Sequence, residues 1–393
     1  MENYKNSKVV YEYIPSNWDW DAFHRLGAFT VVFLNYNKYT MIRQSVASAL
    51  DQDFPVLDIL LMDDASSDGS GDEMERLARA YHGRHMVRVV RNQANHGIPG
   101  QWNIAARLAY GNWLGMFCAD DVSLCNRVTN VARVIAAKPT LRGLCTSGWE
   151  ITTSSKTGEE KRVPILEKWP DCYDCGWADF KGLMKIDTPV IGATAFWHKS
   201  LFDDLLPNVR LDDIMLRWIL QFKNKDICGP VWAWCSSIKA VEYHVGSGIT
   251  NEMKVDGEAV NSRRERWLSE RIAARKLSKV IQTAWQGVIA YYSGHNAPRA
   301  YRKFAELKLL ECKNFNGNTW SRIALLPSIL WYNLSYPNRY GVVLMFHWCA
   351  RMVQEMFGLV FASYVTELHS RLVESRKKRT LKKSATTLTN AQS

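Results

Sequence analysis

Short apolar runs alternate with amphipathic segments from Ala28 onward, and this alternation constrains the fold more than any other feature of the chain. The apolar runs predict strands at residues 29–34, 56–62, 86–90, 113–118 and 141–151. The segments between them predict helices at residues 40–50, 69–81, 99–110 and 126–137. Strands that alternate with helices pair in parallel and are covered by those helices. The sequence therefore predicts an α/β fold with a doubly wound, mostly parallel sheet.

Polar residues come directly after three of the predicted strands. They form the clusters Asn35–Asn37, Asp63–Asp64 and Asp120–Asp121. Ligands of open parallel sheets bind outside the carboxyl ends of the strands. We therefore expect the three clusters to meet in one crevice that forms a binding site.

Asp120 and Asp121 are adjacent carboxylates at the end of an apolar run. Two such groups repel each other unless a positive charge lies beside them. Carboxylate oxygens suit Mg²⁺ and Mn²⁺, so one interpretation is a divalent cation that holds the phosphates of a nucleotide. The other interpretation is a solvated helix N-terminus, which also favours acidic residues.

Six segments, taken in order, resemble the motifs of family 2 glycosyltransferases. They are FLNYN (33–37) with the serines that follow it and Gln52, MDDASSDGS (62–70), NHGIPGQWN (95–103), CADD (118–121), VIGATAFW (190–197) and LDDIMLR (211–217). CADD stands where that family has its DXD-type metal motif, and LDDIMLR resembles its "ED…L..R" element. The resemblance covers roughly residues 28 to 250 and is specific because order and spacing both agree.

This resemblance implies a GT-A fold, with a Rossmann-like sheet flanked by helices, that binds a nucleoside-diphosphate sugar. It assigns donor binding to Tyr36, Asn37, Asp64, Asn95, Asn103 and Asp120. Tyr36 is expected to stack on the base, and Asp64 to bind the imide N–H of the base or the ribose. From the residues alone, ordinary burial of Tyr36 and a turn-forming role for Asp64 remain alternatives.

The resemblance also implies Mn²⁺ or Mg²⁺ as the cofactor. Asp121 is expected to bind the cation, with Asp120 either beside it or on the ribose. The family often shows "YR.H" near the end of the domain, whereas this chain has Tyr243-His244-Val245-Gly246. His244 is therefore a candidate for the metal or the phosphates, with a structural histidine near a glycine-rich loop as the alternative.

Transfer with inversion needs a base that takes the proton of the acceptor hydroxyl. Asp213 matches the family's base position, and Asp212 stands in place of the preceding glutamate. The pair Asp203–Asp204 lies nearby and is a competitor. A helix N-terminus that carries acidic residues for its dipole is the structural alternative.

The expected organisation is an N-terminal extension at residues 1–27, a GT-A domain at 28–250, a helical, membrane-associating region at 251–370 and a basic tail at 371–393. Apolar residues recur at helical spacing from Ala273 to Val288. The apolar stretches 323–338 and 341–365 are interrupted by prolines or charges, so we expect interfacial or core helices rather than membrane spans.

The basic tail contributes to the net charge of +11 and suits an anionic membrane surface, with a solvated terminus as the alternative. No secretory signal is visible at residues 1–5, and the nine scattered cysteines suggest reduced thiols. We therefore expect a cytoplasmic protein, peripheral on the inner face of the plasma membrane. The spacing of Cys172 and Cys175 matches half a zinc site, but no second pair follows at zinc spacing.

The resemblance implies transfer of one sugar from a nucleoside-diphosphate sugar, with a UDP-sugar as the expected donor, to a hydroxyl of a saccharide or lipid-linked saccharide in cell-surface polysaccharide synthesis. Single addition is favoured because residues 263–267 lack the glutamine of the "Q..RW" element of processive synthases. The alternative is a non-catalytic nucleotide-sugar-binding or membrane scaffold protein of the same fold. Nucleic acid is not an expected partner, because no nucleic-acid motif accompanies the basic tail.

Overall fold

The computed structural model describes residues 7–153, 159–165, 171–175, 191–203, 213–224, 226–244 and 285–297, together with Arg302, Ala305, Glu306 and Leu309. The chain divides into two compact units, Met1–Tyr301 and Arg302–Ser393. Every helix and strand named below belongs to the first unit. The predicted basic tail lies outside the described residues, and so does most of the predicted C-terminal helical region.

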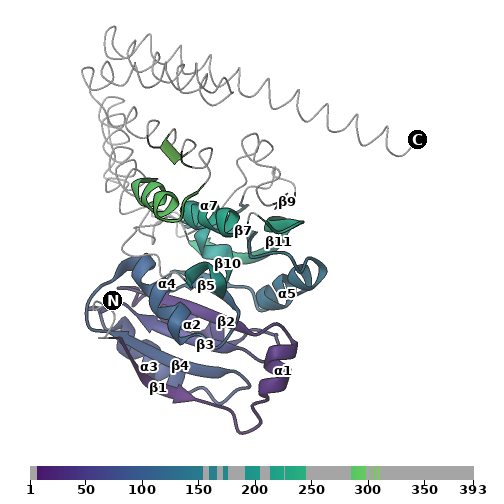
Figure 1. Ribbon diagram of the computed structural model, residues 1–393. Coiled ribbons are helices and arrows are strands. Elements are labelled where there is room, and N and C mark those ends of the chain that lie inside the picture. The colour runs from purple at the N-terminus through teal and green to yellow at the C-terminus, as the bar shows by residue number, and fades with distance from the viewer. Residues whose placement is uncertain are drawn as a thin grey trace, which may run out of the picture. The chain divides into compact units, whose positions relative to one another are not determined.

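Four parallel strands form the centre of the sheet, as the alternation of apolar runs predicts (Figure 1). In spatial order they are β4 (Met86–Asn92), β3 (Asp58–Asp63), β2 (Phe29–Asn35) and β5 (Trp113–Cys118). Every residue of β2 and β3 is buried, which is typical of parallel strands covered on both faces. The expected α/β fold class, with parallel strands at the centre of the sheet and helices beside it, is confirmed.

Helices follow the strands at the expected positions. They are α2 (Ile42–Leu50), α3 (Ser70–Arg79), α4 (Gly97–Leu108) and α5 (Arg127–Ala137). In α2 the buried residues recur at helical spacing, so that one face of the helix packs on the sheet. Gly69, with a φ of 86°, takes the left-handed conformation immediately before α3.

One hydrophobic cluster joins the sheet to three of these helices. Alternate residues of β2, namely Phe29, Val31 and Phe33, share one face of the sheet and pack in this cluster. Residues of α2, α3 and α5 complete it, among them Val46 and Val131. This packed layer holds the strands and helices in fixed positions. It therefore also positions the strand ends that carry the polar clusters.

Further strands extend the sheet on both sides, and one of them, β7 (Gly143–Thr153), corresponds to the strand predicted at residues 141–151. β1 (Ser7–Tyr13) pairs antiparallel with β4 at one edge. On the other side, β10 (Ala195–His198) pairs antiparallel with both β5 and β7, and β7 pairs in parallel with β11 (Pro230–His244).

Three further strands attach to this extension. They are β6 (Asp121–Ser123) and β9 (Cys172–Cys175), which pair antiparallel with β11, and β8 (Glu160–Pro164), which pairs antiparallel with β7.

Three short helices and a longer one complete the first unit. They are α1 (Trp20–Arg25), the 3₁₀ turns η3 (Gly192–Thr194) and η4 (Lys199–Phe202), and α7 (Asp213–Lys223). Residues 285–294 are also helical, inside the region where a helix is predicted. Among the described residues, no helix has the length and apolar character needed to cross a membrane. The predicted domain boundaries remain predictions.

Candidate active site

The carboxyl ends of β2, β3 and β5 lie side by side, so the three polar clusters meet as expected. Asn35 is the register partner of Asp63, and Leu34 is the register partner of Cys118. The pairing continues beyond the strand ends, because the Asp64 N–H donates to the Asn35 carbonyl at 2.9 Å and the Ala119 N–H to the Leu34 carbonyl at 3.0 Å. Residues 35, 64 and 120 are thereby brought to one edge of the sheet.

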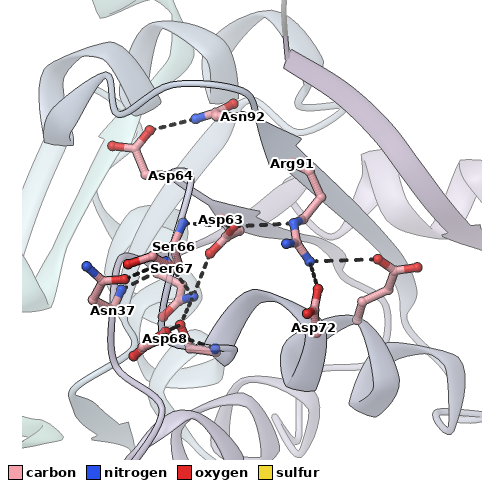
Figure 2. A network of polar contacts seen from close by, with 12 residues as sticks. Asn37, Asp63, Asp64, Ser66, Ser67, Asp68, Asp72, Arg91 and Asn92 are labelled. Atoms are coloured by element: carbon pink, nitrogen blue, oxygen red, sulfur yellow. Dashed lines mark hydrogen bonds and ion pairs between the residues drawn. The ribbon is translucent and has the colours of Figure 1, made fainter.

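Asp63 is a structural residue at the centre of this edge. Its side chain is 1% exposed, and Asn35 Nδ2 donates to its Oδ1 at 2.8 Å. Arg91 Nε lies 3.3 Å from its Oδ2 (Figure 2). The same Asn35 amide group also contacts Ser70 Oγ at 3.0 Å. Asp63 therefore links β3 to β2 and β4, Asn35 connects this group to the start of α3, and the carboxylate of Asp63 is engaged by protein groups.

Asp64 organises the connection between β4 and α4. Its Oδ1 accepts hydrogen bonds from Asn92 Nδ2 at 2.8 Å and from the His96 N–H at 3.0 Å. Its Oδ2 accepts one from the Gly97 N–H at 2.8 Å. Figure 2 shows the contact with Asn92. The contacts add a structural role to the predicted contact of Asp64 with the nucleoside, which stays a prediction.

The loops after β2 and β3 are joined through Asn37. The Asn37 N–H donates to Ser66 Oγ at 3.0 Å, and the Ser67 N–H donates to Asn37 Oδ1 at 2.8 Å (Figure 2). Asn37 has a φ of 52°, a left-handed conformation that asparagine tolerates better than most residues. The side chain of Asn37 is thus used to shape the loop that presents Tyr36.

Tyr36 is 42% exposed at this edge. Ordinary burial, the structural alternative for Tyr36, is therefore wrong. An aromatic ring that is exposed beside the strand ends has a face available for a planar ligand. The exposure agrees with the predicted stacking on a base without testing it.

Asn95 and Asn103 belong to the α4 segment but differ in environment. Asn95 is exposed, and its Oδ1 accepts a hydrogen bond from the Gly97 N–H at 2.9 Å. Asn103 is 4% exposed within α4. The Gly97 N–H at the start of α4 is therefore shared between Asn95 and Asp64. The predicted contacts of Asn95 and Asn103 with the nucleotide sugar stay predictions.

A two-residue turn brings Cys118, Asp120 and Asp121 together. β5 ends at Cys118 and β6 begins at Asp121, with Ala119 and Asp120 between them. The turn is fixed from two sides, because the Ala119 N–H donates to β2 and Ser45 Oγ donates to the Ala119 carbonyl at 2.9 Å. One ligand atom of each of the three residues lies within 4.8 Å of the others.

Asp121 is buried and only partly satisfied. Its side chain is 4% exposed, and its Oδ1 accepts a hydrogen bond from the His244 N–H at 3.2 Å. Its Oδ2 has no hydrogen-bond partner among the described residues. Asp120 is less buried and forms an ion pair with Lys38, whose Nζ lies 3.5 Å from Asp120 Oδ2.

The electrostatic environment disfavours a charged Asp121. Burial raises its pKa well above the ordinary value, and the negative charge of Asp120 raises it further. The backbone N–H of His244 and the charge of Arg127 act in the opposite direction. A divalent cation would supply the missing positive charge and the missing partner of Oδ2. Asp120 and Asp121 therefore fit a cation site.

Arg127 supports this site from inside the protein and was not predicted from the sequence. It is fully buried and donates to Ser123 Oγ at 2.9 Å, the Met116 carbonyl at 2.6 Å and the Ala193 carbonyl at 2.9 Å. Burial lowers its pKa to about 10, so the guanidinium stays charged at neutral pH. The sequence feature that could have indicated a buried Arg127 is its position four residues before Val131, on the apolar face of a predicted helix.

His244 ends β11 beside Asp121. Their association is made by the backbone N–H of His244 and by strand pairing, since Tyr243 is the register partner of Asp121. The imidazole is not part of the three-residue ligand cluster that the described residues contain. The predicted contact of His244 with metal or phosphate stays a prediction.

The structure places only part of the predicted catalytic element. Asp213 is the first residue of α7, and nothing beyond its backbone position is described. Asp212 and Asp204 lie outside the described residues, while Asp203 follows η4. A helix is present from Asp213 onward in the described residues, and the role of Asp213 as a base stays a prediction.

Cys172 and Cys175 lie on β9, opposite Trp234 and Pro230 of β11. In the described parts of the chain, the one group of at least three potential metal ligands is Cys118, Asp120 and Asp121. The predicted zinc half-site is not tested, because the side chain of Cys175 lies outside the described residues.

Comparison with known families identifies one segment of the chain. Residues 30–145 match the family model described as glycosyl transferase family 2. This segment contains the three polar clusters and ends before α7. Comparison with curated protein sequences finds no match.

Several solved structures are similar to the chain. TarS 1–349 of S. aureus, in complex with UDP-GlcNAc, is 15% identical with a TM-score of 0.45, covering 83% of this chain and 91% of that chain. The mannosyltransferase PcManGT from Pyrobaculum calidifontis, in complex with GDP-Man and Mn²⁺, is 18% identical with a TM-score of 0.42, covering 84% of this chain and 87% of that chain.

Proposed function

We propose that this chain, a glycosyltransferase with a family 2 domain at residues 30–145, transfers one sugar from a UDP-sugar to a hydroxyl group with inversion. The acceptor is a saccharide or a lipid-linked saccharide of cell-surface polysaccharide synthesis. The observation that carries the proposal is the buried carboxylate of Asp121 beside Asp120, with its Oδ2 unpaired among the described residues. A site for a cation and a diphosphate accounts for that arrangement.

Donor binding is assigned to the edge where β2, β3 and β5 end. Tyr36 offers an exposed ring for the base, and Asn37 and Asp64 hold the two loops that surround it. Asp120 and Asp121 are the protein ligands of Mn²⁺ or Mg²⁺. When bound, such a cation offsets the negative charge of the diphosphate leaving group.

Acceptor activation is assigned to the start of α7. Asp213 takes the proton of the attacking hydroxyl as its oxygen bonds to the anomeric carbon and the bond from that carbon to the diphosphate breaks. Asp212 is the neighbouring acid that supports this role. A helix N-terminus favours a charged carboxylate, which suits a residue that must accept a proton.

Release of the nucleoside diphosphate from a panel of nucleotide sugars tests this function. The full chain is assayed with Mn²⁺, Mg²⁺ or a chelator, in the presence of saccharide acceptors. We expect one UDP-sugar to be turned over with a divalent cation, and Asp213→Asn and Asp121→Asn each to lower turnover by about 100-fold or more. Full activity in both variants would contradict the proposed mechanism.

The same proposal places the enzyme at the inner face of the cytoplasmic membrane. A lipid-linked acceptor lies at that surface, and the basic segment 371–383 contains a single acid, Glu374. Positive charge together with apolar helices is a common two-part attachment to anionic lipid.

A further inference from the structure

Cys118 lies at the proposed cation site but has no part in the function described so far. It is the last residue of β5, three residues before Asp121. Its Sγ, a carboxylate oxygen of Asp120 and one of Asp121 all lie within 4.8 Å of one another. Atoms at such separations surround a point that one cation can contact from three sides.

Two of the three residues, Cys118 and Asp121, lie on paired strands, and Asp120 lies in the two-residue turn between them. Cys118 is paired with Leu34 of β2, and Asp121 is paired with Tyr243 of β11. The turn between them is fixed at Ala119 by the bonds from β2 and from Ser45. Ligands on paired strands and in a short, hydrogen-bonded turn keep their positions without a bound cation, so the cluster is a preformed arrangement.

A second observation, the unsatisfied oxygen of Asp121, indicates that this cluster binds a ligand. Asp121 Oδ2, more than nine-tenths buried with its residue, has no hydrogen-bond partner among the described residues. Buried carboxylate oxygens are normally paired, because an unpaired one loses its hydration without compensation. The guanidinium of Arg127 interacts electrostatically with both Cys118 and Asp121.

We propose that Cys118 Sγ is a third protein ligand of the cation, together with Asp120 and Asp121. The inference rests on the proposed function, since it concerns the same cation. On binding, the bond between Sγ and the metal forms as the thiol releases its proton to solvent. Soft thiolate ligands favour Zn²⁺ and similar ions, whereas Mg²⁺ prefers oxygen. The site therefore selects Mn²⁺ over Mg²⁺ and binds thiophilic Cd²⁺ more tightly than an all-carboxylate site would.

Cadmium titration of the metal-free, full-length chain tests the proposal without an activity assay. The ultraviolet charge-transfer absorption of a Cd²⁺–thiolate bond reports sulfur ligation, and competition with Mn²⁺ and Mg²⁺ gives the relative affinities. The variants are Cys118→Ser, which is close to isosteric, and Cys118→Asp, which makes the ligand set all-carboxylate. The matched control is Cys125→Ser, because Cys125 is exposed and lies outside the cluster. Circular dichroism checks that each variant is folded.

In the wild type and in Cys125→Ser, we expect the first Cd²⁺ equivalent to produce the absorption band. Cys118→Ser loses that band and binds Cd²⁺ about tenfold or more weakly, with a smaller change for Mg²⁺. Cys118→Asp shifts the preference from Cd²⁺ toward Mg²⁺. A first-equivalent band and a Cd²⁺ affinity that are unchanged in Cys118→Ser would overturn the proposal.

Asp121→Asn separates this inference from the proposed function. If Asp121→Asn abolishes Mn²⁺ binding while Cys118→Ser keeps the wild-type Cd²⁺ band, then Cys118 is not a ligand and the cation site of the proposed function stands. If the wild type turns over no nucleotide sugar but loses its Cd²⁺ band in Cys118→Ser, the ligand assignment stands and the proposed activity fails. If the wild type binds no divalent cation, both are overturned.

Discussion

At the scale of single residues, the chain places a carboxyl group where burial and a neighbouring carboxylate disfavour its charged form. Asp121 is buried, lies beside another carboxylate and has an oxygen that no described group satisfies. A residue that only supported the fold would gain from a neutral side chain of the same shape. Keeping an aspartate there is consistent with a role in binding, in the way that functional sites commonly trade stability for activity.

The first prediction concerns Asp121→Asn in the absence of metal. We expect its free energy of unfolding to equal or exceed that of the wild type, because the amide replaces a buried carboxyl group whose charged form is disfavoured by burial and by Asp120. Urea denaturation with a chelator present measures this. Asp51→Asn, at an exposed position, is the control. A marked loss of stability in Asp121→Asn would show that the carboxylate is structural.

The second prediction concerns His85, which is fully buried with its Nε2 3.0 Å from the Gln52 carbonyl oxygen. Burial lowers its pKa from 6.5 to about 4, so the folded protein binds fewer protons than the unfolded chain between these values. The neutral, buried His85 therefore contributes its full stabilisation above pH 6.5. As the pH falls toward 4, the free energy of unfolding decreases by about 3 kcal/mol.

Unfolding free energies measured across this pH range check the effect of His85. His85→Gln keeps a donor for the Gln52 carbonyl but does not titrate. As the pH falls from 6.5 to 4, we expect the wild type to lose more free energy of unfolding than His85→Gln does. A difference that is independent of pH would rule out a neutral, buried His85.

At the scale of elements, a buried ion pair joins the central strands at the end opposite the proposed site. Arg88 Nη2 donates to both oxygens of Asp58 at 2.7 Å, and Thr30 Oγ1 donates to Asp58 Oδ2 at 2.8 Å. These contacts connect β4, β3 and β2. Breaking one side of such a pair leaves the other charge buried without a partner.

The third prediction follows from this pair. Arg88→Met should lower the free energy of unfolding by about 3–5 kcal/mol, because Asp58 is then left charged and unpaired. The double variant Asp58→Asn/Arg88→Met should lose less than Arg88→Met alone. Chemical denaturation of the three proteins measures both effects. Equal stability of the single and double variants would show that the charge of Asp58 is not the cause.

Elements were predicted from the sequence where burial is uniform and were missed where it is not. The central strands are continuous apolar runs because both of their faces are covered. β1 is an exposed edge strand with a register shift between Val9 and Tyr11, so its sequence lacks an apolar pattern. β11 pairs with β7, but its register shifts between Cys235 and Lys239 and again before Glu242, which interrupts the pattern.

The site was predictable to the extent that its residues follow strands in the sequence. The clusters around Asn37, Asp64 and Asp121 could be found because parallel strands bring their ends together. The partners of these clusters could not, since Lys38, Asn92 and Arg127 reach them through contacts that depend on loop and helix geometry. Spacing along the chain carries no information about such contacts.

At the scale of the whole molecule, the proposed membrane attachment and the proposed donor site are carried by different parts of the chain. The donor site lies within residues 30–145, whereas the basic segment begins at Arg371. Attachment through charge and apolar helices depends on the lipid surface, and donor binding does not. The two properties are therefore expected to be separable by truncation.

The fourth prediction is that removal of the residues after Arg371 releases the protein from anionic vesicles while turnover of a water-soluble acceptor persists. The lost charge weakens attraction to the lipid headgroups by about 1 kcal/mol per basic residue near the surface. Flotation with phosphatidylserine-containing vesicles measures binding, and neutral phosphatidylcholine vesicles are the control. Unchanged binding to the anionic vesicles would contradict the role of the tail.

The central claim is that the ends of β2, β3 and β5 form a cation-dependent site for a nucleoside diphosphate. Calorimetric titration of the full chain with UDP tests it most directly, with Mn²⁺ or with a chelator, in the wild type and in Asp121→Asn. The account predicts that the chelator weakens UDP binding to the wild type by about tenfold or more, which is ~1.4 kcal/mol, and that Asp121→Asn removes this dependence. UDP affinity that is the same with and without cation in the wild type would contradict the account.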